Sequence, residues 1–160
     1  MLPVPRVPRP KPKSSPDVTP RSRALRLLAR REHSRAELAR KLAAHVDDKA
    51  ELSALLDDLA AHGWISETRV VEQLVHAKRA RYGPARLRQV LLSKGISEDL
   101  IAPALSKLKT GEVSAARTIW ARKFRAPPTS REERAKQVRF LQGRGFSLET
   151  ALRVVAGRDE

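Results

Sequence analysis

The clearest pattern in the chain is a stripe of four leucines spaced as on one face of an α-helix. They occupy positions i, i+3, i+4 and i+7: Leu52, Leu55, Leu56 and Leu59. The stripe predicts a helix from about Lys49 to His62, with Gly63 closing it as a C-cap residue. We expect the leucine face to be buried, Leu56 included.

Two shorter helices are predicted ahead of this stripe. Residues 24–31 place Ala24, Leu25 and Leu28 on one face. Ser34 then precedes Glu37 by three residues, a capping box that begins a second helix. The apolar face of that second helix is Leu38, Ala39 and Leu42.

The same apolar pattern recurs 49 residues further along the chain. Seven pairs keep this offset: Leu25 and Leu74, Leu38 and Leu87, Leu42 and Leu91, Leu52 and Ile101, Leu55 and Ala104, Leu56 and Leu105, and Leu59 and Leu108. A constant offset over so many positions indicates an internal repeat. In this second unit we expect Gly83 to close the first helix and Pro84 to open the next.

A third, less regular unit follows. Its first helix is predicted from the four-residue spacing of Ala116, Trp120 and Phe124, and Pro127 and Pro128 end it. A second capping box, Ser130 with Glu133, begins the next helix. The string Gly95-Ile96-Ser97 recurs 50 residues later as Gly145-Phe146-Ser147, and Ile101, Ala104 and Leu105 then map to Ala151, Val154 and Val155.

The predicted fold class is therefore all-α: three tandem three-helix repeats, about nine helices, stacked into an elongated, curved solenoid. The expected repeats are residues 21–66, 67–110 and 111–156. A Pro-rich basic arm at 1–20, expected to be disordered, precedes them, and a tail at 157–160 follows. Pro103 predicts a kink or a late start in its helix. Leu105, like Leu56, is expected in a core.

The net charge of the chain indicates what kind of partner it binds. The 160 residues hold 33 basic and 18 acidic side chains, a formal charge of +15. Residues 21–68 are nearly neutral, whereas residues 69–95 carry seven bases against the single acid Glu72. Such an excess favours a polyanionic partner, nucleic acid or an acidic protein surface, over a merely soluble basic protein. With no cysteine and no apolar run of membrane-spanning length, a cytoplasmic protein is expected.

The basic residues fall in two clusters at matching places in the second and third repeats. The candidate contact residues are Lys78, Arg79, Arg81, Arg86, Arg88, Lys94, Arg122, Lys123, Arg125, Arg134, Lys136 and Arg139. The alternative is an ordinary solvated face, but surface helices usually alternate in sign and these do not. Tyr82 lies at a turn, where it could stack on a base or pack over a helix end. The other large aromatic residues are expected in the core: Trp64, Trp120, Phe124, Phe140 and Phe146.

Catalytic chemistry is not indicated. The four histidines have no metal-ligand spacing, and a surface or capping role is expected for each: His33, His45, His62 and His76. The seven glycines form no phosphate-binding loop, and no serine lies in a nucleophile elbow. We therefore expect no enzyme, no cofactor and no metal site.

Several strings along this repeat resemble those of one protein family. They are Leu28-Ala29-Arg30-Arg31-Glu32-His33-Ser34-Arg35-Ala36-Glu37-Leu38, Gly63-Trp64-Ile65-Ser66-Glu67, Arg81-Tyr82-Gly83-Pro84-Ala85-Arg86-Leu87, Lys94-Gly95-Ile96, and Phe140-Leu141-Gln142-Gly143-Arg144-Gly145-Phe146. In this order and spacing, over residues 21–156, the chain resembles the RecX regulatory proteins. It departs from the family at Val70-Val71, where a Phe-Ala pair is usual, so local packing is expected to differ.

The resemblance implies a function that composition alone does not. RecX proteins dock in the groove of the RecA filament on single-stranded DNA and limit filament growth. They thereby lower ATPase, strand-exchange and co-protease activity and damp the SOS response. The resemblance implies two partners, the RecA filament and the single-stranded DNA within it, together with weak direct DNA binding. It also implies no association with a membrane and a monomeric protein. The alternatives are a stand-alone helical DNA-binding protein that does not depend on RecA, and an adaptor for an acidic protein.

Overall fold

The computed structural model describes residues 18–157, and within them the chain is helical, with no strand. The nine α-helices of these described residues are α1 Pro20–Arg30, α2 Arg35–Leu42, α3 Lys49–Ala61, α4 Glu67–Lys78, α5 Pro84–Ser93, α6 Glu98–Ser106, α7 Glu112–Lys123, α8 Arg131–Gly143 and α9 Leu148–Val155. Two single 3₁₀ turns, Ala43–His45 and Lys109–Gly111, follow α2 and α6. The arm expected at 1–20 lies outside the described residues up to residue 17, as does the tail from 158.

Short polar side chains begin most of these helices. The predicted capping box at Ser34 and Glu37 is confirmed in full, with both reciprocal hydrogen bonds present. The second predicted box is only half formed: Ser130 accepts from the Glu133 N–H, but the Glu133 carboxylate turns to the backbone and hydroxyl of Thr129. The first helix begins inside the predicted arm, because Thr19 caps it and Pro20 needs no N–H at that position.

Each repeat has its own apolar core, as the leucine stripes predict. The three clusters of fully buried residues are Ala24, Leu38, Leu42, Leu56, Leu59 and Ile65; Val70, Val71, Leu74, Leu87, Leu91, Ile96, Ile101 and Leu105; and Ala116, Ile119, Val138, Leu141, Phe146, Ala151, Val154 and Val155. Full burial of a Val, Leu, Ile or Phe side chain stabilises the fold by about 1.5–3 kcal/mol. The expected burial of Leu56 and Leu105 is confirmed.

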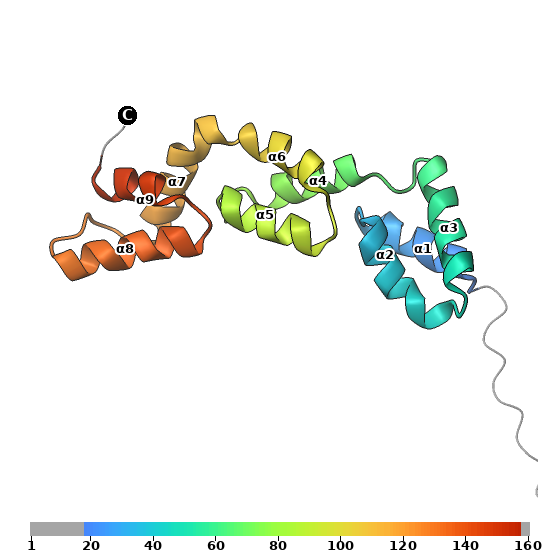
Figure 1. Cartoon of the computed structure of the whole chain (residues 1–160). Helices are drawn as coiled ribbons and strands as arrows, with labels where there is room; N and C mark the ends of the chain where they lie inside the picture. The colour runs from blue at the N-terminus through green and yellow to red at the C-terminus, as the bar shows by residue number, and fades with distance from the viewer. Residues whose placement is uncertain (1–17, 158–160) are drawn as a thin grey trace, which may run out of the picture.

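The three repeats follow one another in an elongated row, which confirms the all-α repeat fold (Figure 1). The helices α1–α3 form one end of the row, α4–α6 its middle and α7–α9 the other end. Among the described residues, no helix is both long and apolar enough to span a bilayer.

Two predictions about burial are wrong. Trp64 was expected in the core but is 50% exposed, because it is the second residue beyond the C-cap of α3 and its N–H bonds back to Leu59, which leaves the ring outside. A surface or capping role was expected for His33, and the surface alternative is wrong: the side chain is buried, with Nδ1 3.0 Å from the carbonyl of Arg31, the C-cap residue of α1, and Nε2 3.0 Å from Lys41 Nζ. Burial lowers the pKa of His33, so it is neutral at pH 7.

Two predictions about helix ends also need correction. Of the kink or late start expected at Pro103, the late start is absent, because the helix begins at Glu98 and the proline lies in its second turn. Gly83 does not close α4, which ends at Lys78; it is instead the N-cap of α5, with an extended backbone.

The predicted burial of the other aromatic residues holds in part: Phe146 is buried, and Trp120 is half-buried with its indole N–H donating to Gln137.

Candidate functional site

The middle helices of the three repeats meet end to end. The C-terminal turn of α5 contacts the N-terminus of α2, where the Ser34 hydroxyl donates to the Lys94 carbonyl. The C-terminal turn of α8 contacts the N-terminus of α5, where the Gly83 N–H donates to the Arg144 carbonyl at 2.7 Å. We call these the first joint and the second joint. At both, the negative end of one helix dipole faces the positive end of the next, which is a favourable arrangement.

Charges at the first joint are paired. The Glu37 carboxylate lies 2.6 Å from Lys94 Nζ and 3.0 Å from Arg31, and its side chain is only 8% exposed. Burial opposes ionisation of Glu37, but hydrogen bonds from Arg31, Lys94 and the Ser34 N–H outweigh it and lower its pKa to about 2. A second ion pair, between Arg69 and Glu32 at 2.9 Å, joins the same two repeats. The first joint is therefore an ion-paired contact between the two repeats.

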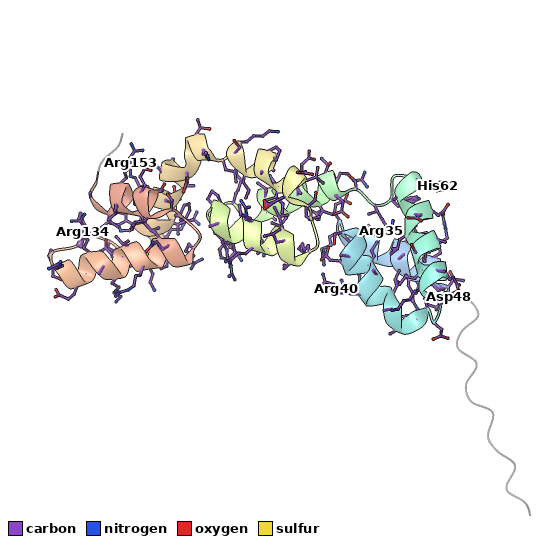
Figure 2. The ribbon with its side chains drawn as sticks, in the orientation of Figure 1. Arg35, Arg40, Asp48, His62, Arg134 and Arg153 are labelled. Atoms are coloured by element: carbon purple, nitrogen blue, oxygen red, sulfur yellow. The ribbon has the colours of Figure 1, made fainter. Side chains whose placement is uncertain are left out.

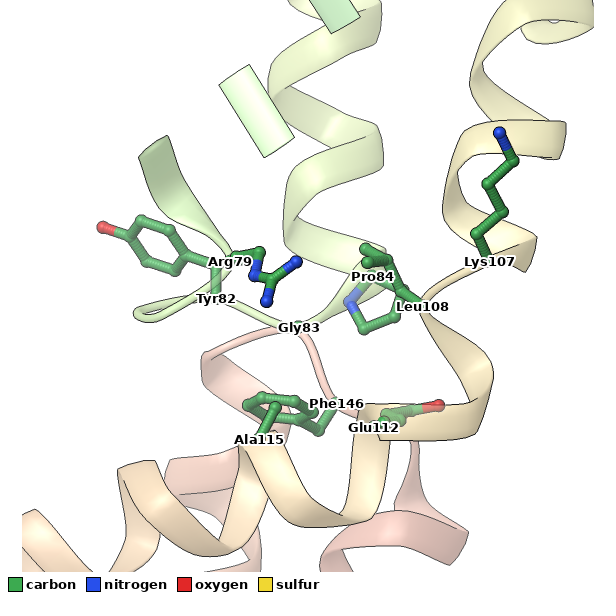
Figure 3. A pocket seen from close by; sticks show the side chains of 10 residues that line it. Arg79, Tyr82, Gly83, Pro84, Lys107, Leu108, Glu112, Ala115 and Phe146 are labelled. Carbon is green, nitrogen blue, oxygen red and sulfur yellow. The ribbon is translucent and has the colours of Figure 1, made fainter. Parts of the chain in front are cut away.

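The backbones at the second joint approach so closely that glycine is required on both sides. A Cβ on Gly83 would lie 2.6 Å from the Gly145 carbonyl carbon, and a Cβ on Gly145 would lie 2.4 Å from the Arg86 nitrogen. The Ala85 N–H also donates to the Gly145 carbonyl at 3.0 Å. Figure 3 shows the segment at Gly83 lying directly over the chain of the third repeat near Phe146. The role of Gly83 is thus to allow this approach.

The two joints are built from equivalent positions that carry different charges. His33, Ser34 and Glu37 of the first joint correspond, at the offset of 49, to Tyr82, Gly83 and Arg86 of the second. Lys94 corresponds to Arg144 at the offset of 50 that also relates Gly95 to Gly145. Where the first joint has a carboxylate facing a lysine, the second has an arginine at each position.

The cations of the second joint gather around two aromatic rings. The Tyr82 ring centroid lies 5.8 Å from Lys78 Nζ, 5.6 Å from Arg86 Cζ and 5.9 Å from Arg144 Cζ. Arg144 Cζ also lies 5.2 Å from the centroid of Phe140, which Lys123 Nζ approaches at 6.0 Å. Such cation–π contacts are worth about 0.5–1 kcal/mol each at exposed sites. They hold side chains of both repeats in one cluster.

Beside these rings lies an open hollow of about 400 Å³. We call it the basic hollow; its lining residues are Ala80, Arg81, Tyr82, Ile119, Arg122, Lys123, Phe140 and Arg144. Six cations lie at the rings or in the lining: Lys78, Arg81, Arg86, Arg122, Lys123 and Arg144. Among the described residues, no ion pair joins any of the six to a carboxylate. The site carries a concentrated and uncompensated positive charge.

The structure separates the twelve candidate residues into three groups. Five lie at the basic hollow or its rings: Lys78, Arg81, Arg86, Arg122 and Lys123. Two are engaged in ion pairs, Arg88 with Glu98 and Lys94 with Glu37. The others are exposed elsewhere: Arg79, Arg125, Arg134, Lys136 and Arg139. Arg79 lines a separate pocket beside Gly83 and Pro84 (Figure 3), and Arg134 lies on the third repeat, toward the end of the molecule (Figure 2).

Sequence reasoning left Arg144 out of the contact set, although it contacts both rings. The signal that identifies it is the repeat itself, since Arg144 occupies the position of Lys94, which bridges two repeats at the first joint. The Arg144 guanidinium also lies 3.5 Å from the Arg81 carbonyl. A comparison of equivalent positions, as opposed to a search for basic runs, would have singled it out.

Within residues 18–157 the structure shows no cluster of three or more potential metal ligands. The two carboxylic acids whose pKa values are lowered apart from Glu37 are Asp58, beside Arg21, and Glu133, beside Thr129. Asp58 lies in the last turn of α3, where its ion pair with Arg21 joins α3 to α1, and Glu133 lies in the first turn of α8, where it accepts hydrogen bonds from Thr129. What the second joint can do with its own residues is bind anions.

Comparison with known proteins gives a consistent result. Three family models match in order: RecX, first three-helix domain, at residues 21–50; the second at 66–105; and the third at 111–155. The regulatory protein RecX of Leptothrix cholodnii is 51% identical over 140 residues, 88% of this chain and 89% of that protein. That of Ralstonia nicotianae is 45% identical over 87% of each chain. The crystal structure of RecX from Lactobacillus salivarius has a TM-score of 0.75 at 20% identity, over 88% of this chain and 94% of that one, and supports the fold.

Proposed function

Because the chain belongs to the RecX family of regulatory proteins, we propose that it is a negative regulator of RecA. It binds in the groove of the RecA filament on single-stranded DNA and limits filament growth. ATP hydrolysis, strand exchange and co-protease activity fall as a consequence. We also propose that the protein is monomeric and acts in the cytoplasm.

The observation that carries the proposal is the uncompensated charge of the second joint on an elongated body. A groove that winds along a filament suits a partner that is long and narrow, and a row of three repeats has that form (Figure 1). A RecA filament on DNA is rich in phosphates, which attract the six cations of the second joint. The first repeat is nearly neutral and its joint is ion-paired, so we assign it to protein–protein contact.

The proposed contact residues are the basic residues of the two clusters, together with Arg144, that no carboxylate of the described chain neutralises. They are Lys78, Arg79, Arg81, Arg86, Arg122, Lys123, Arg125, Arg134, Lys136, Arg139 and Arg144. Arg88 and Lys94 are left out because each is held by a carboxylate of this chain. The proposed contact residues face DNA or acidic filament surface.

The test is RecA's ATP hydrolysis on single-stranded DNA with this protein titrated in. Inhibition well below one molecule per RecA is expected, because blocking filament growth affects many protomers at once. A variant with charges reversed at Arg79, Arg81 and Arg86 is expected to need far more protein for the same inhibition. Absence of inhibition, or inhibition that begins only when the DNA itself is coated, would refute the proposal in favour of a stand-alone DNA-binding protein.

A further inference from the structure

The two joints give an internal comparison of what this architecture needs in order to hold two repeats together. The first joint uses a carboxylate, Glu37, against Lys94, and the second places Arg86 and Arg144 at the same positions. Both joints form the contact between an N-cap and a C-terminal turn, so the fold does not require the positive charge of the second. Arg86 and Arg144 lie 5.6 and 5.9 Å from the Tyr82 ring centroid, and among the described residues no carboxylate is paired with either, so their repulsion is an electrostatic cost that a bound anion would remove.

We propose that the second joint binds the phosphodiester backbone of a single-stranded nucleic acid, with Arg86 and Arg144 from neighbouring repeats contacting phosphates. This inference rests on the proposed function, since it assigns the nucleic-acid contact of that function to one place in the chain. Arg81, Arg122 and Lys123 line the adjoining basic hollow and extend the binding surface along the strand. Because both repeats contribute, the site exists only when they are joined.

The side chains are arranged for oxyanions. A guanidinium presents paired N–H donors that match two phosphate oxygens. Contacts with the Tyr82 and Phe140 rings restrict Arg144, so the side chain gives up less freedom on binding. The faces of these rings are approached by cations of the chain itself, so they are not offered to bases. The chain therefore binds the nucleic-acid backbone, independently of base sequence.

The charge density favours a nucleic acid over an acidic peptide. A nucleic-acid strand carries one negative charge for every nucleotide, so consecutive phosphates can neutralise several of the six cations around one hollow. We therefore commit to the phosphodiester backbone and make the acidic peptide an outcome of the test.

The experiment measures binding of the full chain to a fluorescein-labelled oligothymidylate by fluorescence anisotropy, without RecA, over a series of NaCl concentrations. The main variant is Arg86→Glu, which places a carboxylate where Glu37 stands at the first joint. We expect it to bind at least tenfold more weakly at low salt. The steepness of the salt dependence should fall by about 0.7 for each phosphate that the variant no longer neutralises.

A matched control separates this site from a general reduction of charge. Arg26→Glu changes the net charge equally on the exposed face of α1 in the first repeat. We expect it to weaken binding by less than threefold. If both variants reduce affinity equally, binding is a diffuse effect of net charge and the inference is wrong.

Two further measurements keep the result independent of folding and of partner class. Arg86→Glu should melt no lower than the parent chain, because a glutamate in the first turn suits the helix dipole. If it melts lower, the affinity of Arg144→Gln becomes the test, because this substitution keeps the hydrogen bond from the Gly83 N–H to the carbonyl of residue 144. Parental affinity in Arg144→Gln would overturn the inference. An oligoglutamate of equal charge that displaces the oligonucleotide at the same concentration would also overturn it.

The same variants in the RecA assay separate the two proposals. If the parent chain fails to inhibit RecA while Arg86→Glu selectively abolishes oligonucleotide binding, the proposed function fails and the site stands. If the parent chain inhibits RecA while Arg86→Glu binds the oligonucleotide like Arg26→Glu, the site fails and the proposed function stands.

Discussion

Gly145→Ala is expected to uncouple the third repeat from the second. Gly145 has a φ of +96°, and a Cβ there would lie 2.4 Å from the Arg86 nitrogen and 2.5 Å from the Arg86 Cβ. Neither neighbour can yield without moving the first turn of α5. The two hydrogen bonds of the second joint, from Gly83 to Arg144 and from Ala85 to Gly145, must then lengthen or break.

The cost has two parts. A residue with a Cβ in the left-handed region costs about 1–2 kcal/mol. Breaking two backbone hydrogen bonds adds roughly 1 kcal/mol each. We expect a total of about 3–4 kcal/mol in the free energy of unfolding, measured by urea denaturation followed by circular dichroism. Because repeat proteins are stabilised by their interfaces, the transition should also broaden as the third repeat unfolds separately.

Gly63→Ala is the matched control for backbone conformation. Gly63 has a φ of +75° and ends α3 in the same hydrogen-bonding pattern, but nothing lies within 4 Å of a Cβ there. It should cost only the backbone part, about 1–2 kcal/mol, with one cooperative transition. Equal destabilisation of Gly145→Ala and Gly63→Ala would refute the view that close backbone approach maintains the second joint.

Two other substitutions test the first joint and the core. The lowered pKa of Glu37, about 2 against 4.5 for the free side chain, means that its carboxylate stabilises the fold fully above pH 4.5 and that this effect disappears as the pH falls towards 2. Glu37→Gln should therefore lower the free energy of unfolding at pH 7 by up to about 3 kcal/mol and by much less at pH 3, and a difference that does not change with pH would contradict this. Leu105→Asp should cost more than about 4 kcal/mol and melt the second repeat, since an unpaired charge would enter its core, whereas Leu92→Asp on the exposed side of α5 should cost less than about 1 kcal/mol by thermal melting.

Most of the local structure could be predicted from the sequence because its causes are local. The capping box at Ser34 and the leucine stripe of α3 act within one or two turns of helix, and both are present as predicted. Repetition of the stripe at an offset of 49 predicted the second repeat, and the less regular recurrence at an offset of 50 predicted the third, since each unit needs its own apolar core. At Val70-Val71, where the family usually has a Phe-Ala pair, both valines are buried in the second core.

The burial predictions that failed concern residues at the turns between helices, where the helical spacing no longer fixes which side faces a core. Trp64 was expected in a core because it lies beside an apolar stripe, but its place beyond the C-cap of α3 turns it to solvent. A surface or capping role was expected for His33 because the histidines have no metal-ligand spacing, but it is buried beside the first joint, where it contacts Lys41 and the Arg31 carbonyl. Composition and spacing do not specify which side of a turn meets the next repeat.

The sequence by itself determined the helices, the repeat and the excess of positive charge, because propensity, periodicity and net charge are properties of the chain alone. The tertiary structure decided which charges remain available. It pairs Lys94 with Glu37 and Arg88 with Glu98, and it gathers Arg86 and Arg144 from different repeats around one tyrosine. The physical reason is that an ion pair depends on a few ångströms between side chains: Arg88 and Glu98 reach that distance when α5 packs on α6, and Lys94 and Glu37, 57 positions apart, reach it only when whole repeats are stacked.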